Sequence, residues 1–88
     1  MKLIRVKEGE FKRLIKTRTV TTLLAQESNV KDGKFSLFGI DENNQQGYAI
    51  RHGRVDVLRT WRIDVLSAFA KSLGFTSIEV YFSRIDKK

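Results

Sequence analysis

Apolar and polar positions recur with a helical period in the last third of the chain. The apolar residues of this stretch share one stripe of a helix over about residues 63–73, and they are Val65, Leu66, Phe69, Ala70 and Leu73. Gly74 follows at the position where a left-handed residue ends many helices, and Lys71 lies in the last turn. The pattern therefore predicts the main helix of the protein, with Thr60 as its cap and Asp64 in its first turn.

The N-terminal segment has a weaker pattern that allows two interpretations. Leu3–Val6 is typical of a short strand, and Glu8–Lys16 then places Phe11, Leu14 and Ile15 at helical spacing. Acids come early in this second stretch and bases come late, as the helix dipole prefers. The pattern is compatible with a short N-terminal helix, and a continued strand is the alternative.

The remaining apolar segments have the composition or the alternation of strands. They are predicted at Thr17–Gln26, Lys34–Ile40, Tyr48–Arg51, Val55–Thr60 and Ser77–Ser83. Asp32-Gly33, the polar stretch 41–47 and His52-Gly53-Arg54 are typical of the turns between them. In the last strand, Ile78, Val80 and Phe82 share one face, which predicts a half-buried strand.

These elements predict an α+β fold for residues 1–88, taken as a single domain. We expect a mostly antiparallel sheet of about five or six strands, in which the middle strands form an antiparallel meander. The main helix, about 63–73, packs on one face, together with the short N-terminal helix if it forms. A sheet covered on one side leaves its other face for solvent, for a partner or for a second copy, so we also expect a homodimer.

Composition narrows the possible chemistry. The chain has no cysteine and one histidine, which excludes disulfides and thiolate metal sites and favours a cytoplasmic protein. No apolar run is long enough for a signal-peptide core or a membrane span, so we expect a soluble protein with no membrane partner. Only Asp41-Glu42 gives adjacent carboxylates, and it lies in a predicted turn. We therefore predict a protein that is not an enzyme and that has no catalytic residue, cofactor or metal.

The formal net charge of +7 is concentrated in two blocks. Residues 1–18 hold seven basic and two acidic side chains, residues 51–62 hold four arginines and one acid, and residues 19–50 are net acidic. The candidate phosphate-binding residues are Lys2, Arg5, Lys7, Lys12, Arg13, Lys16 and Arg18 in the first block and Arg51, Arg54, Arg59 and Arg62 in the second. On one surface they would neutralise about five to seven phosphates, with a log-log salt slope of about −4.5 to −6 on duplex DNA.

Aromatic side chains beside such bases could stack on the bases of a single strand. The candidates are Phe35 or Phe38, Tyr48, Trp61 and Tyr81. Trp61 is more often a lid on the start of a helix than a stacking platform, and Tyr81 is the more exposed candidate. Phe35 and Phe38 lie three residues apart in one strand and point to opposite faces, so one of them should be in the core.

The segment from Gly53 to Phe75, followed by Ser77-Ile78-Glu79-Val80, resembles the C-terminal half of small plasmid-borne partition or stability proteins of the ParC type. The shared pattern is a Gly-centred hairpin, Arg-Thr-aromatic, a helix that ends in Leu-Gly, and a short acid-containing strand. The resemblance implies an accessory protein of a mobile element that acts in plasmid maintenance. Arg54, Arg59 and Trp61 fall on the pattern, and no catalytic residue comes with it.

The sequence thus predicts a small basic accessory protein that binds the phosphate backbone of nucleic acid, with DNA favoured. Two other interpretations of the basic blocks stay open. One is a solvated face, and the other is a protein-interaction module or a plasmid- or phage-encoded modulator that binds an acidic protein partner.

Overall fold

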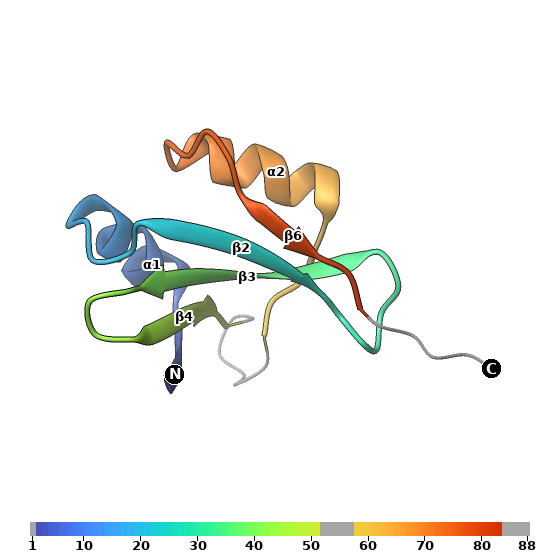
Figure 1. Ribbon diagram of the computed structural model, residues 1–88. Helices are drawn as coiled ribbons and strands as arrows, with labels where there is room; N and C mark the ends of the chain where they lie inside the picture. Colours follow the sequence, from blue (N-terminus) through green and yellow to red (C-terminus); the bar gives the residue numbers. More distant parts are fainter. Residues whose placement is uncertain (1, 52–57, 84–88) are drawn as a thin grey trace.

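The computed structural model describes residues 2–51 and 58–83 and has the predicted α+β fold (Figure 1). Six strands and two helices follow one another as β1 Lys2–Val6, α1 Glu8–Lys16, β2 Thr22–Glu27, β3 Lys34–Asp41, β4 Gln46–Ile50, β5 Trp61–Arg62, α2 Ile63–Ser72 and β6 Glu79–Tyr81. The N-terminal helix and the main helix both form where the helical spacing predicts them. Neither helix has the length and hydrophobicity needed to span a bilayer.

The sheet is mixed, with strand order β1-β4-β3-β2-β6 and with β5 beside the start of β3. Strands β2, β3 and β4 form the predicted antiparallel meander. The two edge strands do not continue the antiparallel pattern: β1 runs parallel to β4, and β6 runs parallel to β2. Helix α2 carries the chain back along the sheet, so β6 starts from the same end as β2 (Figure 1).

The predicted strand Thr17–Gln26 is wrong in its first half. Thr17 caps the end of α1, and its hydroxyl donates a hydrogen bond to the Leu14 carbonyl at 3.3 Å. Arg18 takes a left-handed conformation with φ 64°, which turns the chain away from the helix. The first threonines are therefore used to end α1, and the strand begins only at Thr22.

The C-terminal end of α2 is as predicted from the sequence, and its N-terminal end is not. Gly74 has φ 95°, the left-handed conformation expected after the last turn. The N-cap position is Arg62 and not Thr60, because Trp61 and Arg62 first pair with Phe35 and Lys34 as β5. Asp64 lies in the first turn as predicted.

Two other predictions concern the chain between β4 and α2. The turn at residues 52–54, with Arg54, lies outside the described residues, as do residues 55–57 of the predicted strand Val55–Thr60. Of the described part, Leu58 forms an isolated antiparallel bridge with Arg51, and regular pairing begins only at Trp61.

Both helices pack on the same face of the sheet. Phe11 from α1 and Leu66 and Ala70 from α2 join Leu23 and Leu37 of the sheet in one buried cluster. The two phenylalanines of β3 divide as predicted, since Phe35 is buried in this cluster and Phe38 belongs to the opposite face. Strand pairing assigns four partly or fully exposed apolar side chains to that opposite face: Leu3, Leu24, Phe38 and Ile40. Among the described residues, no helix covers it.

The last strand is more exposed than predicted. Val80 and Phe82 are 36% and 73% exposed, although the alternation predicts a half-buried strand. The difference arises because β6 is the outermost strand and only three residues long. Ile78, before the strand, is the member of the alternating set that is partly buried against the core.

Candidate nucleic-acid surface

Several of the predicted phosphate-binding residues are held in ion pairs within the fold. On α1, Lys12 pairs with Glu8 at 3.1 Å, and Arg13 pairs with Glu10 one turn earlier. At the start of α2, Arg62 donates two hydrogen bonds to Asp64, from Nε at 3.1 Å and from Nη2 at 2.6 Å. This arrangement lowers the pKa of Asp64 and raises that of Arg62.

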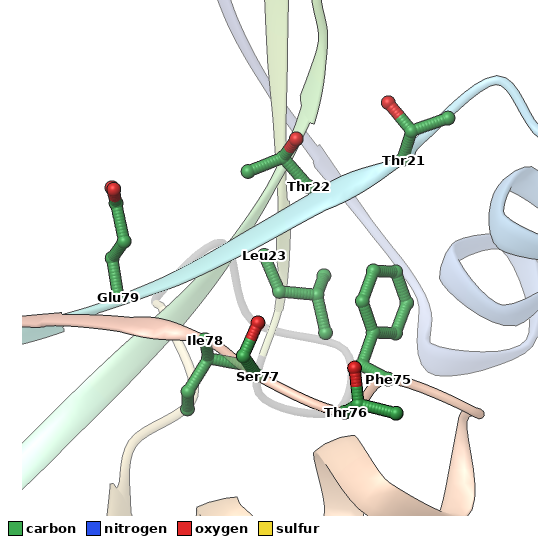
Figure 2. Close-up of a pocket in the computed structure, with 8 residues that line it drawn as sticks. All are labelled: Thr21, Thr22, Leu23, Phe75, Thr76, Ser77, Ile78 and Glu79. Carbon is green, nitrogen blue, oxygen red and sulfur yellow. The ribbon is translucent and has the colours of Figure 1, made fainter.

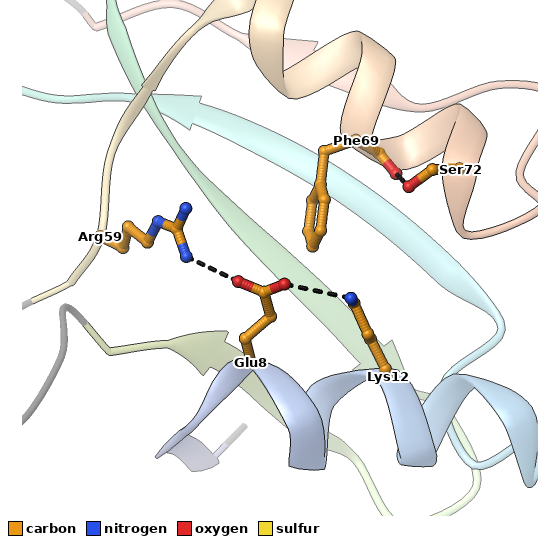
Figure 3. Close-up of polar contacts among 5 residues, drawn as sticks. All are labelled: Glu8, Lys12, Arg59, Phe69 and Ser72. Atoms are coloured by element: carbon orange, nitrogen blue, oxygen red, sulfur yellow. Dashed lines mark hydrogen bonds and ion pairs between the residues drawn. The ribbon is translucent and has the colours of Figure 1, made fainter.

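Arg59 belongs to a cluster that joins α1 to α2 (Figure 3). Its Nη1 donates to Glu8 Oε1 at 2.7 Å, so one carboxylate holds both Arg59 and Lys12. The hydrogen bond from Lys12, and then that from Arg59, lowers the pKa of Glu8. The contact between Arg59 and Glu8 joins residues 51 positions apart in the sequence. Arg59 and Lys12 therefore stabilise the fold before any ligand is present.

Two aromatic rings, Trp61 and Phe69, complete this cluster. The indole stacks on Phe69 with ring centroids 5.7 Å apart and lies under the Arg59 guanidinium at 4.9 Å. Lys12 Nζ lies 5.9 Å from the Phe69 ring. Trp61 is only 7% exposed, so a nucleic-acid base could stack on it only if the cluster opened. This is the lid-like position that the sequence favours for Trp61.

The other aromatic candidate lies on the opposite face of the sheet. Tyr81 is 47% exposed, and its hydroxyl donates to Glu79 at 2.9 Å. The hydrogen bond to this carboxylate raises the pKa of Tyr81. Arg5 is exposed on β1 and belongs to the same face as Leu3, while Arg51 continues β4 with its Nε buried and without a hydrogen-bond partner in the described segments. The structure thus puts Tyr81 and Arg5 on the face of the sheet opposite to that of Trp61.

A different set of bases gathers where the C-terminal ends of α1 and α2 meet. Lys16 and Arg18 line a hollow of about 390 Å³ together with Leu73 and Gly74, and Lys71 lines a second hollow of about 190 Å³. Lys71 is the one base here that the two sequence blocks miss, although its place in the last helical turn is evident from the sequence. In the part of the chain that the structure describes, none of these three side chains has an ion-pair partner.

Hydroxyl groups line the space between these bases. A hollow of about 530 Å³ adjoins the other two and shares Phe75 with both, and its lining includes Thr21, Thr22, Thr76 and Ser77. In Figure 2 the hydroxyls of Thr76 and Ser77 point toward β2 across this hollow. We call this region, made of Lys16, Arg18, Lys71 and the four hydroxyl residues, the helix-end surface.

The helix-end surface can offer charge and hydrogen-bond donors to the same ligand, except that the Thr22 hydroxyl already donates to Glu42 Oε2 at 3.4 Å. Its bases also offset the partial negative charge of the two helix C-termini, which is their local role in the fold. Glu79 lines the same hollow as the hydroxyls, so the surface is not uniformly positive. Lys2 and Lys7 are exposed on and beside β1 and likewise have no ion pair within the described segments.

The described residues contain no group of three or more histidine, aspartate or glutamate side chains that could hold a metal ion. Comparison of the chain with protein-family models, with curated proteins and with solved structures gave no match. The resemblance to ParC-type proteins therefore stays a prediction.

Proposed function

We propose that this protein binds the phosphate backbone of DNA, without catalysis, as a cytoplasmic accessory protein of a mobile element. The observation that supports this proposal is the helix-end surface, where Lys16, Arg18 and Lys71 have no acidic partner in the described segments and lie beside four hydroxyl side chains. Bases and hydroxyls are the side chains that commonly contact phosphate oxygens. The ParC-type resemblance supports a role in plasmid maintenance.

The proposed DNA-binding surface does not include every base of the two basic blocks. Lys12, Arg13, Arg59 and Arg62 already have carboxylate partners, so contact with phosphate would have to compete with those partners. We assign the principal contacts to the helix-end surface, with Lys2 and Lys7 as further candidates. In the homodimer that we also propose, two such surfaces would be present and the number of phosphate contacts would double.

Removing charge from the helix-end surface tests this function. In Lys16→Gln combined with Arg18→Asn, two cations are lost, and asparagine accepts the left-handed conformation of residue 18. Binding to mixed-sequence DNA should weaken, and the log-log salt slope should become shallower by about 1.8, since each phosphate contact contributes about 0.9. Fluorescence anisotropy between about 50 and 200 mM salt measures both quantities.

A matched control is Lys31→Gln combined with Lys34→Gln, which removes the same charge at the other end of β2, about 20 Å away. This pair should leave the slope within about 0.5 of the wild-type value, because only the net charge and not a contact is lost. Equal effects from the two pairs, or DNA binding that does not depend on salt, would contradict the proposal.

A second candidate function is the binding of an acidic protein. The observation that favours it is the opposite sheet face, where Leu3, Leu24, Phe38 and Ile40 line a hollow of about 330 Å³ beside Lys2. An apolar centre with a basic side chain at its margin fits a protein partner of opposite charge. Absence of DNA binding at about 50 mM salt would favour this function over the first.

A further inference from the structure

The two edges of the sheet differ in charge. Strand β1 begins with Lys2, contains Arg5 and is followed by Lys7, so one edge carries three bases. Strand β6 lies at the other edge, within the segment Ser77–Ser83, which contains no base and only one acid, Glu79. Charged side chains, lysine above all, are a common protection of sheet edges against pairing with another chain. The β1 edge has this protection, and the β6 edge lacks it.

Exposed apolar side chains surround the β6 edge on the side that faces α2. Val80 and Phe82 point to this side, and the Phe82 ring meets the buried Phe35 edge-on at 6.1 Å. Ile63, which is 37% exposed, precedes Ser67 by one helical turn, and Ser67 lines a hollow together with Ile78. The N-terminal end of α2 also lies toward the C-terminal end of β6 (Figure 1). We call Ile63, Val80 and Phe82 the β6-edge patch.

We propose that the β6 edge pairs with the β6 edge of a second copy of this chain, antiparallel and about a two-fold axis at Val80. Charge favours a second copy as the occupant. Two molecules of net charge +7 repel each other wherever their basic surfaces meet, and β6 is the sheet edge at which they can approach without opposing bases. The joined sheets would extend across both copies, with the helices of both on one side.

The alternation along β6 is self-complementary in this register. Residues directly opposite each other in an antiparallel pair share a face, so Val80 meets Val80 of the second copy and Ile78 meets its Phe82. On the other face, Glu79 meets Tyr81 of the second copy, and within one copy the same two side chains already share a hydrogen bond at 2.9 Å. A register centred on Glu79 would instead place two carboxylates opposite each other.

Sedimentation equilibrium of the full chain over about 1–500 μM tests the proposal, because a strand of three residues forms a small interface, and small interfaces belong to the weakly associating class. The mass should rise from the 10.2 kDa of one chain toward twice that value. Val80→Lys places two like charges on the axis and should raise the dimer dissociation constant at least tenfold. Leu3→Lys makes the same change on the β1 edge, and it should leave the constant within twofold.

A mixture of Val80→Lys and Val80→Glu chains provides a rescue, because opposite charges then meet at the axis. The mixture should dimerise more tightly than either variant alone, a result that loss of folding could not produce. A wild-type chain that stays monomeric throughout, or a dimer that Val80→Lys does not weaken, would overturn the proposal. DNA binding is measured separately, and each Val80→Lys protomer keeps the helix-end surface, so failure of one proposal is distinguishable from failure of the other.

Discussion

The carboxylate of Glu8 pairs with two bases that the sequence alone presents as candidate phosphate ligands. It lies in the first turn of α1, where an acid is favoured by the helix dipole, and it also holds Lys12 and Arg59. Arg59 and Lys12 in turn lie over Trp61 and Phe69. Two cations that are candidate phosphate ligands in the sequence are therefore part of the contact between α1 and α2.

Replacing Glu8 should destabilise the fold in a way that depends on pH. Glu8→Gln should lower the free energy of unfolding at pH 7 by about 0.5–1 kcal/mol, the range of partly exposed pairs. The folded-state pKa of Glu8 lies below its ordinary value, so its contribution is present above that ordinary value and is lost as pH falls through the folded-state pKa. Urea unfolding from pH 7 down to about pH 3 should show the difference between wild type and variant shrinking.

Glu10→Gln is the control for this comparison. Glu10 is also in the first turn of α1, but its partner Arg13 lies on the same helix and the pair joins no other element. Its replacement should have the smaller effect at pH 7. An equal effect, or a Glu8 difference that grows toward acid pH, would show that the shared carboxylate does not act as described.

At the scale of elements, α1 and β3 meet more closely than most side chains would allow. Gly39 faces the helix layer, and a methyl group there would lie 2.7 Å from Val20 Cγ1 and 3.1 Å from the Phe11 ring. Glycine is needed at this place for space and not for its backbone conformation. The close approach lets Phe11 become fully buried against the sheet.

Two glycine substitutions should therefore change the stability of the protein in opposite directions. Gly39→Ala should destabilise the protein by about 1–3 kcal/mol, because the methyl group overpacks the core. Gly9→Ala, in α1 with nothing within 4 Å of the new methyl group, should stabilise it by about 0.5–1 kcal/mol through helix propensity. Thermal or urea unfolding measures both, and a Gly39→Ala variant as stable as wild type would show that the helix can move away at no cost.

At the scale of the whole molecule, the sheet has a well-paired centre and two different edges. Strands β2, β3 and β4 pair on both sides, whereas β1 and β6 each pair on one side only. The edge with bases and the edge without them lie at opposite sides of the same sheet. The molecule thus has the bases of β1 at one edge and, at the other, the edge that we propose for a second copy.

Hydrogen exchange should distinguish the paired centre of the sheet from its two edge strands. In dilute solution, amides of β3 and of the facing parts of β2 and β4 should exchange most slowly, and those of β1 and β6 should exchange faster. If the proposed dimer forms, the protection of Glu79–Tyr81 should rise with protein concentration while that of Lys2–Val6 stays constant. Exchange followed by mass spectrometry at two concentrations measures this, and a concentration effect on β1 instead would place the interface at the wrong edge.

The sequence by itself determined the elements whose signals are local. The apolar spacing predicted α2 and left α1 open between a short helix and a continued strand. The left-handed preference of glycine placed the turn at Gly33 and the end of α2 at Gly74, and the strand alternation put Phe35 and Phe38 on opposite faces. Each of these features depends on residues only a few positions apart, so periodicity and backbone preference are sufficient to predict it. The two basic blocks could also be read from the sequence.

Only the tertiary structure decided which segments lie side by side. The parallel pairing of β1 with β4 and of β6 with β2 follows from the path of the whole chain, and so does the outer position that leaves Val80 and Phe82 exposed. The ion pair of Glu8 with Arg59 joins residues 51 positions apart, a separation at which sequence spacing carries no information about contact. For this reason the charge was predictable, whereas the division between paired and uncompensated bases was not.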